Sequence, residues 1–192
     1  MSAIQQVLAS YGSVSVTYAT WNPSDKWANI ILSNGNLTVA DTTAGNAHSV
    51  RSTISKWASS WKWYWEMYIV EGSFSVQGIA NSSAGLTNFI GATANWWSYY
   101  NTGQKINNWS ITAYWSSYTT GDTIWVALDY SGASASITFY KNNVSQWVAF
   151  SGITWSIFAA SSEYPLSSQT TNFWASAFTY SPPAGFNAWL YN

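Results

Sequence analysis

The sequence predicts an all-β protein built as an antiparallel β-sandwich. Short segments rich in Val, Ile, Thr, Tyr, Phe and Trp alternate with Ser, Asn and Gly, and the apolar periodicity of a helix is almost absent. A chain of 192 residues is long enough to bury a full core in one domain, and no repeat, linker or block of charge divides it. We therefore expect one sandwich domain over residues 20–192, preceded by a segment 1–19.

The expected elements follow this alternation along the chain. Residues 3–9 are long enough for a helical turn or two, so segment 1–19 is predicted to be short and helical or extended, serving for attachment or as an edge strand. The predicted strands are 13–20, 30–32, 36–40, 48–52, 62–69, 75–80, 98–100, 105–107, 123–130, 136–141, 144–150, 157–161 and 169–173. Asn34-Gly35 and Asn142-Asn143 are expected to form tight turns.

The predicted strand 62–69 has a clear two-residue alternation. Trp63 and Trp65 fall on one face, while Lys62, Tyr64 and Glu66 fall on the other. This pattern is typical of a half-buried strand, so the two tryptophans are expected in or near the core. The same inward role is expected of Val126, Leu128, Ile137 and Phe139, and the segment with Pro182, Pro183 and Gly185 is expected to close the edge of the sandwich.

The composition argues against several classes of partner. The chain has six basic and seven acidic residues and a net charge of -1, so no positive surface for nucleic acid or an anionic membrane is expected. It contains no cysteine, and its long uncharged runs are too rich in Ser, Asn, Thr and Gly for membrane insertion. The start of the sequence has no basic stretch ahead of an apolar one, so no secretory signal is visible.

The order of four motifs is similar to that of a known family. The motifs are VRSTISKWASSWKWYWEMYI, SVQGIANSSAGLTNFIG, TTGDTIWVALDYSGASASITFYKNNVSQWVAF and FTYSPPAGFNAWL. Together they resemble a SPRY domain, which is a concanavalin A-like β-sandwich, from about residue 20 onward. The most specific parts are 62–66, the run 121–129 and the FYKN segment that follows. This resemblance implies a non-catalytic binding module whose ligand, usually a protein, docks on loops at one end of the sandwich.

Tryptophan stands at many positions where members of that family usually carry glycine. The eleven positions are Trp27, Trp57, Trp61, Trp96, Trp109, Trp115, Trp125, Trp147, Trp155, Trp174 and Trp189, and only Trp21, Trp63, Trp65 and Trp97 match the family. One explanation is a gene of a phage or bacterium that reads UGA as glycine. The alternative is that all fifteen tryptophans are native, which requires burying or exposing an unusual amount of indole surface.

No catalytic or metal-binding constellation is predicted, and no cofactor. Glu66 and Glu71 are five residues apart, so they point to opposite faces of a continuous strand, as do Asp122 and Asp129. There is no nucleophile elbow, no phosphate-binding loop and no calcium-loop spacing. The single His48 is expected on the surface or on an edge strand. The sequence therefore predicts that the protein is not an enzyme, with a degenerate glycan hydrolase as an alternative.

The predicted ligand-binding residues lie in the polar and aromatic segment 81–100. They are Asn81, Asn95, Trp97, Tyr99 and Tyr100, which combine amide hydrogen bonding with rigid aromatic surface. An alternative is that these side chains only pack beneath the loop. The expected partner is a protein or a cell-surface glycan, together with other virion proteins or further copies of the chain.

The start MSAIQQVLASYG resembles the beginning of many phage tail or fibre proteins. With the low charge and the absence of cysteine, it favours a virion-associated receptor-binding protein, such as a tail fibre or decoration protein, located in the virion or at the host cell surface. The alternative is a free carbohydrate- or protein-binding SPRY module of a bacterium.

Overall fold

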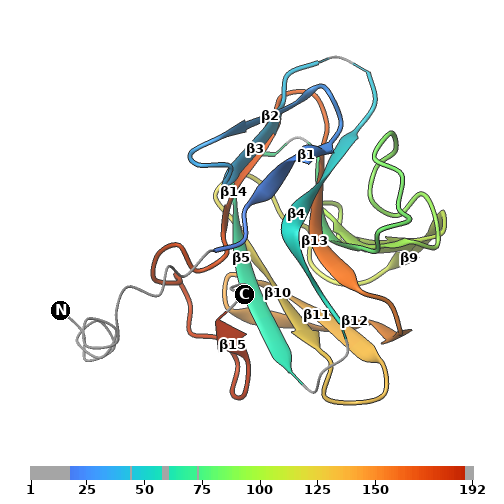
Figure 1. Ribbon diagram of the computed structural model, residues 1–192, viewed down its shortest axis with the longest axis vertical. Helices are drawn as coiled ribbons and strands as arrows, with labels where there is room; N and C mark the ends of the chain where they lie inside the picture. The colour runs from blue at the N-terminus through green and yellow to red at the C-terminus, as the bar shows by residue number, and fades with distance from the viewer. Residues whose placement is uncertain (1–17, 44, 58–60, 73, 189–192) are drawn as a thin grey trace.

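Two antiparallel sheets packed face to face form the structure, which confirms the expected sandwich (Figure 1). The computed structural model describes residues 18–43, 45–57, 61–72 and 74–188. These residues form strands and turns, with no helix among them. The helical turn expected at 3–9 and nearly all of the strand expected at 13–20 lie outside the described residues.

Each sheet combines runs of consecutive strands with strands distant in the sequence. In order across the first sheet, the seven strands are β1 (Trp21–Lys26), β4 (His48–Lys56), β13 (Ile157–Glu163), β6 (Ser75–Ala80), β7 (Trp96–Tyr100), β8 (Gln104–Asn107) and β9 (Ser110–Ala113). The second sheet follows the order β12 (Val144–Ile153), β11 (Ala135–Lys141), β10 (Thr123–Asp129), β5 (Lys62–Glu71), β14 (Ser167–Asn172), β3 (Thr38–Asp41) and β2 (Ile30–Ser33). A short eighth strand, β15 (Asn187–Ala188), pairs in parallel with β5.

Twelve predicted strands correspond to β2 through β8 and β10 through β14, with ends that differ by up to four residues. The strands β1, β9 and β15 were not predicted. Strand β1 contains Pro23, which is tolerated because this strand lies at an edge of its sheet and its register with β4 is irregular. Strand β9 lies at the opposite edge and is exposed along its whole length, so it has no buried face.

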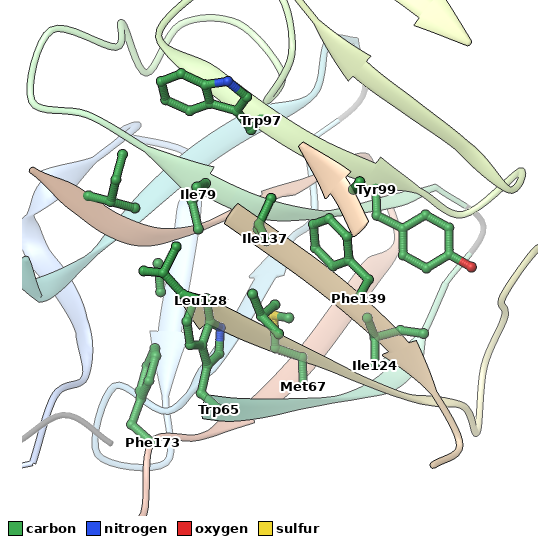
Figure 2. Packing of buried hydrophobic residues seen from close by; sticks show 14 of the residues in the cluster. Trp65, Met67, Ile79, Trp97, Tyr99, Ile124, Leu128, Ile137, Phe139 and Phe173 are labelled. Carbon is green, nitrogen blue, oxygen red and sulfur yellow. The ribbon is translucent and has the colours of Figure 1, made fainter. Parts of the chain in front are cut away.

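The core lies between the sheets and follows the predicted alternation (Figure 2). Trp65 and Met67 on β5 are fully buried. The inward side chains expected on β10 and β11 are confirmed, including Leu128 and Phe139. The facing sheet contributes Ile79 and Tyr99 among others, so both inner faces supply large apolar groups.

The C-terminal segment after β14 covers the outer face of β5. Glu66 accepts hydrogen bonds from the backbone N–H groups of Thr179 and Tyr180, both at 2.8 Å, and from the Tyr64 hydroxyl at 2.6 Å. The ring of Phe178 packs edge-on against Tyr64, with 4.7 Å between ring centroids. Tyr64 and Glu66 are therefore buried although they point away from the core. The segment then passes through Pro182, Pro183 and Gly185 to reach β15.

A buried carboxyl group joins the two sheets at one end of the sandwich. Glu163 on β13 accepts hydrogen bonds from Ser161 at 2.6 Å, from Ser75 on β6 at 3.2 Å, and from Ser167 on β14 at 2.9 Å. Because β14 belongs to the other sheet, the carboxyl group bridges the two layers. Burial raises the pKa of Glu163 to about 7, and the serine hydroxyls limit that rise.

A second polar contact joins the sheets beside the first. His48 on β4 donates a hydrogen bond from Nδ1 to the Asp41 carboxylate on β3, and Asp41 also accepts bonds from the backbone and hydroxyl of Thr43. His48 is only 8% exposed and lies on an interior strand. The expectation that it lies at the surface or on an edge strand is wrong, because a neighbouring carboxylate makes its burial favourable.

Replacing Glu66 should release the C-terminal segment. The Glu66→Ala variant leaves two backbone N–H groups and one hydroxyl without their acceptor, so we expect the free energy of unfolding to fall by about 3 kcal/mol. Hydrogen exchange should accelerate at Thr179 and Tyr180. The control is Glu71→Ala, because Glu71 is exposed on the same strand. Unchanged exchange at Thr179 and Tyr180 in Glu66→Ala would show that Glu66 does not anchor the segment.

Stability should depend on pH through Glu163. Between pH 4.5 and about 7, the folded protein holds a proton that the unfolded chain has released, so the free energy of unfolding should fall as pH rises. The full loss is about 3 kcal/mol, and the Glu163→Gln variant should lack it. Urea unfolding at a series of pH values measures both proteins. Parallel pH profiles for the two proteins would refute this assignment.

Candidate ligand-binding site

The loop 81–95, between β6 and β7, folds over the outer face of the seven-stranded sheet. Its residues Ala84 and Ile90 pack on Val76 and Ala80 of β6 and form a second apolar cluster outside the main core. Strand β6 is consequently buried on both faces along its whole length. The loop is therefore part of the packed structure and presents a fixed surface.

Polar side chains from the sheet below hold this loop in place. Arg51 on β4 pairs with Asp25 through two hydrogen bonds of 2.8 Å and donates from Nη1 to the carbonyl groups of Asn81 and Ala84. Ser49 and Ser162 bond each other and contact the backbone of Asn88 and Ile90, respectively. The main chain of 81–90 is thus fixed at both of these points, which is the preorganisation that a binding surface needs.

A cleft of about 250 Å³ opens where this loop meets four other connections. The loop contributes Thr87, Asn88 and Phe89. The other lining residues come from the connections β3–β4, β5–β6, β8–β9 and β13–β14, and they are Asn46, Ala47, Phe74, Trp109 and Tyr164. The turn holding Trp109 is itself bonded to the loop, through the carbonyl groups of Thr93 and Gly91.

The chemistry of the cleft is aromatic and uncharged. Phe89 meets Trp109 edge-on with ring centroids 5.1 Å apart, and Phe74 contacts Tyr164 at 4.9 Å. The side chains of Asn46 and Asn88 are exposed beside these rings. All eight lining residues are uncharged. Such a surface suits a neutral polar ligand that offers hydrogen-bonding groups and a flat apolar face.

Residues that form the inter-sheet contacts are next in the sequence to residues that line the cleft. The buried residues His48, Ser75 and Glu163 are each adjacent in the chain to a lining residue, which are Ala47, Phe74 and Tyr164 in that order. Three of the five connections around the cleft therefore start or end at a buried hydrogen-bonded group. The Glu163 and His48 contacts fix the spacing of these connections.

The predicted ligand-binding residues Asn81 and Asn95 pair with each other at the two ends of the loop. The Asn81 amide donates to Asn95 Oδ1 at 2.9 Å, and Asn81 Oδ1 accepts from the backbone of Ser83. Asn81 is 3% exposed, whereas Asn95 is half-buried. Both residues close the loop, and their contact with a ligand stays a prediction.

The three predicted aromatic residues lie on β7. The side chains of Trp97 and Tyr99 point into the core, and Tyr100 packs against Phe74, a lining residue of the cleft, with 4.6 Å between ring centroids. Burial raises the pKa of Tyr100 to about 12, so its hydroxyl stays neutral. Their role as ligand contacts stays a prediction. Sequence reasoning did not single out Asn46, Phe74 or Tyr164, because only the fold brings them to the loop 81–95.

Six of the seven acidic side chains are bonded to structural partners. Besides Glu66, Asp41, Asp25 and Glu163, Asp122 bonds Lys141 at 3.1 Å and Asp129 bonds Lys62 at 2.9 Å. Glu71 is exposed at the end of β5. Within the described residues, no group of three His, Asp or Glu side chains could hold a metal ion. The same residues contain no helix long and apolar enough to cross a membrane.

Comparison with solved structures identifies the architecture. The SPRY domain of human HERC1 matches with a TM-score of 0.66 and 19% identity, over 79% of this chain and 96% of that domain. A human SPRY domain matches with a TM-score of 0.64 and 17% identity, over 78% and 98% of the two chains. The TRIM65 PSpry domain matches with a TM-score of 0.61 and 13% identity, over 81% and 92%.

The comparison of sequences gives the family. No curated protein matches this chain. The family model of the SPRY domain matches residues 62–173, which is more than half of the 192 residues and includes β5 through β14. The expected resemblance is confirmed, and the chain belongs to the SPRY domain family, whose members are generally non-catalytic protein-binding modules.

Proposed function

We propose that this protein is a non-catalytic binding module that captures a neutral polar ligand in the cleft between loop 81–95 and the neighbouring connections. The observation that carries this proposal is the construction of the cleft. Five connections meet there, their lining is aromatic and uncharged, and the main chain beneath is fixed by buried hydrogen bonds. A rigid concave surface of this kind binds without a large ordering cost.

The absence of an enzymatic role is part of the proposal. Glycoside hydrolysis needs two carboxyl groups that face one bond. Glu66 is buried and holds the C-terminal segment, while Glu71 is exposed at the end of the same strand. The chemistry that the cleft offers is hydrogen bonding from exposed amides and contact with aromatic rings, which supports recognition.

The favoured ligand is an uncharged polar surface of another protein. Membership of a generally protein-binding family supports this choice, and so does the lack of charge in the cleft. A cell-surface glycan is the second candidate, because exposed amides beside aromatic rings also suit sugars. Exposed Asn46 and Asn88 beside Phe89 and Tyr164 supply that combination.

The proposed setting is a phage particle, with the ligand on the surface of the host cell. The low charge and the resemblance of the first residues to phage tail and fibre proteins support this setting. The protein would then act as a receptor-binding or decoration protein. A free bacterial SPRY module is the alternative, and it would bind without being part of a particle.

Binding of the labelled protein to intact host cells tests the function. We expect saturable binding that the Asn88→Ala and Phe89→Ala variants weaken at least about tenfold, because truncation of central contact residues typically has that effect. The matched control is Tyr68→Ala, since Tyr68 is an exposed aromatic residue on the outer face of the other sheet. The control should bind like the unchanged protein.

Treatment of the cells identifies the class of ligand. Loss of binding after mild proteolysis of the cell surface supports a protein ligand, and loss after removal of polysaccharide supports a glycan. Equal binding of Phe89→Ala and Tyr68→Ala would exclude the cleft as the binding site. Absence of any saturable binding by the folded protein would reject the adhesion role.

A further inference from the structure

Three tryptophans adopt a backbone conformation that tryptophan strongly disfavours. The φ angles are 61° at Trp109, 62° at Trp147 and 84° at Trp174. In the left-handed region the Cβ atom of an L-residue comes too close to the following carbonyl group, so glycine and, less often, asparagine occupy it. Five of the other six described non-glycine residues with positive φ are asparagines, as expected, and the sixth is Leu166.

Trp109 occupies the glycine position of a hairpin turn. Asn108 and Trp109 join β8 to β9 with φ angles of 52° and 61°. The Asn142-Asn143 turn between β11 and β12 has nearly the same pair of angles, 47° and 69°. A two-residue turn with positive φ at both positions favours Asn followed by Gly. The backbone of the Asn108-Trp109 turn is therefore the one that an Asn-Gly sequence favours, with tryptophan at the glycine position.

Trp147 lies in a bulge that also calls for glycine. Tyr140 pairs with Ser145 and Thr138 pairs with Val148, so β12 has one more residue than β11 over this interval. A bulge whose extra residue is left-handed normally uses glycine there. Trp147 is 66% exposed, and no core contact accounts for a large side chain at this site.

Exposure separates the tryptophans that match the family pattern from most of those that do not. Three of the four that match the family pattern are buried, namely Trp21, Trp65 and Trp97, and Trp63 packs partly buried against the core. Seven others are exposed by 38% to 66%, and they are Trp57, Trp61, Trp109, Trp115, Trp147, Trp155 and Trp174. Of the remaining described positions that differ from the family, Trp96 and Trp125 are buried and Trp27 is partly buried, so exposure does not single them out. A soluble domain rarely exposes so much indole surface. All three left-handed tryptophans belong to the exposed group.

We infer that the organism's own protein carries glycine at these seven exposed positions, because its translation reads UGA as glycine. A single reassigned codon explains why one residue type recurs at turns and bulges while the same residue type also fills the core. Trp21, Trp63, Trp65 and Trp97 are then encoded by UGG. For the cleft, glycine at position 109 removes one aromatic wall and leaves Phe74, Phe89 and Tyr164 as its rings.

The gene and the native protein test this inference together. We expect UGA at the seven exposed positions and UGG at Trp21, Trp63, Trp65 and Trp97. Mass spectrometry of peptides from the protein made in its own host should give the masses calculated with glycine. UGG codons at Trp109, Trp147 and Trp174, or native peptides with tryptophan masses at those positions, would overturn the inference.

Two triple variants test whether tryptophan is unfavourable at the three positions with left-handed backbone. The W109G/W147G/W174G protein relieves three disfavoured conformations, so its midpoint of thermal unfolding should rise by roughly 5 °C. The matched control, W21G/W65G/W97G, removes three core side chains and should unfold at a much lower temperature or fail to fold. A lower midpoint for the W109G/W147G/W174G protein would contradict the proposed glycine positions.

Discussion

The hydrogen bonds of the buried Glu163 carboxyl group determine how the two sheets meet at the end that carries the cleft. The large apolar groups Trp65 and Met67 hold the sheets together in the middle of the sandwich. At the cleft end, serines from both sheets converge on Glu163, and His48 bonds Asp41 across the same gap. Hydrogen bonds are directional and favour one arrangement, whereas apolar contacts tolerate small shifts. The connections that begin or end at these groups therefore have fixed positions relative to one another.

Much of the fold could be predicted from the sequence because the inner faces obey a two-residue alternation. Strand β5 is the clearest case, since Trp65 and Met67 point inward and Tyr64 and Glu66 point outward. The alternation could not indicate that Tyr64 and Glu66 are also buried. They are covered by residues 178–180, which lie more than one hundred positions later in the sequence. Strand β9 has no buried face and β1 buries only Trp21, so neither shows the buried alternation of the inner strands. His48 was misplaced because its partner Asp41 lies on another sheet.

The candidate site was only partly predictable. The segment 81–100, which the sequence indicated as a polar and aromatic stretch, contributes Thr87, Asn88 and Phe89 to the lining of the cleft. Its Asn81 and Asn95 side chains are used to close the loop, and the alternation along β7 sends Trp97 and Tyr99 into the core. Five of the eight lining residues come from other connections, among them Asn46, Phe74 and Tyr164. These residues are separated by up to 118 positions, and only strand pairing brings them together.

The anchoring of the C-terminal segment by Glu66 also has a kinetic consequence. The two backbone bonds to Glu66 join residues 113 and 114 positions apart, and β5 pairs with β14 at similar separation. Contacts this distant in sequence give a high contact order, which slows folding. During synthesis on the ribosome, β5 has its first neighbour when β10 emerges and is covered on its outer face only when residues 178–180 follow. The centre of the second sheet thus remains open to solvent, and to association with other nascent chains, until nearly the whole domain has been made.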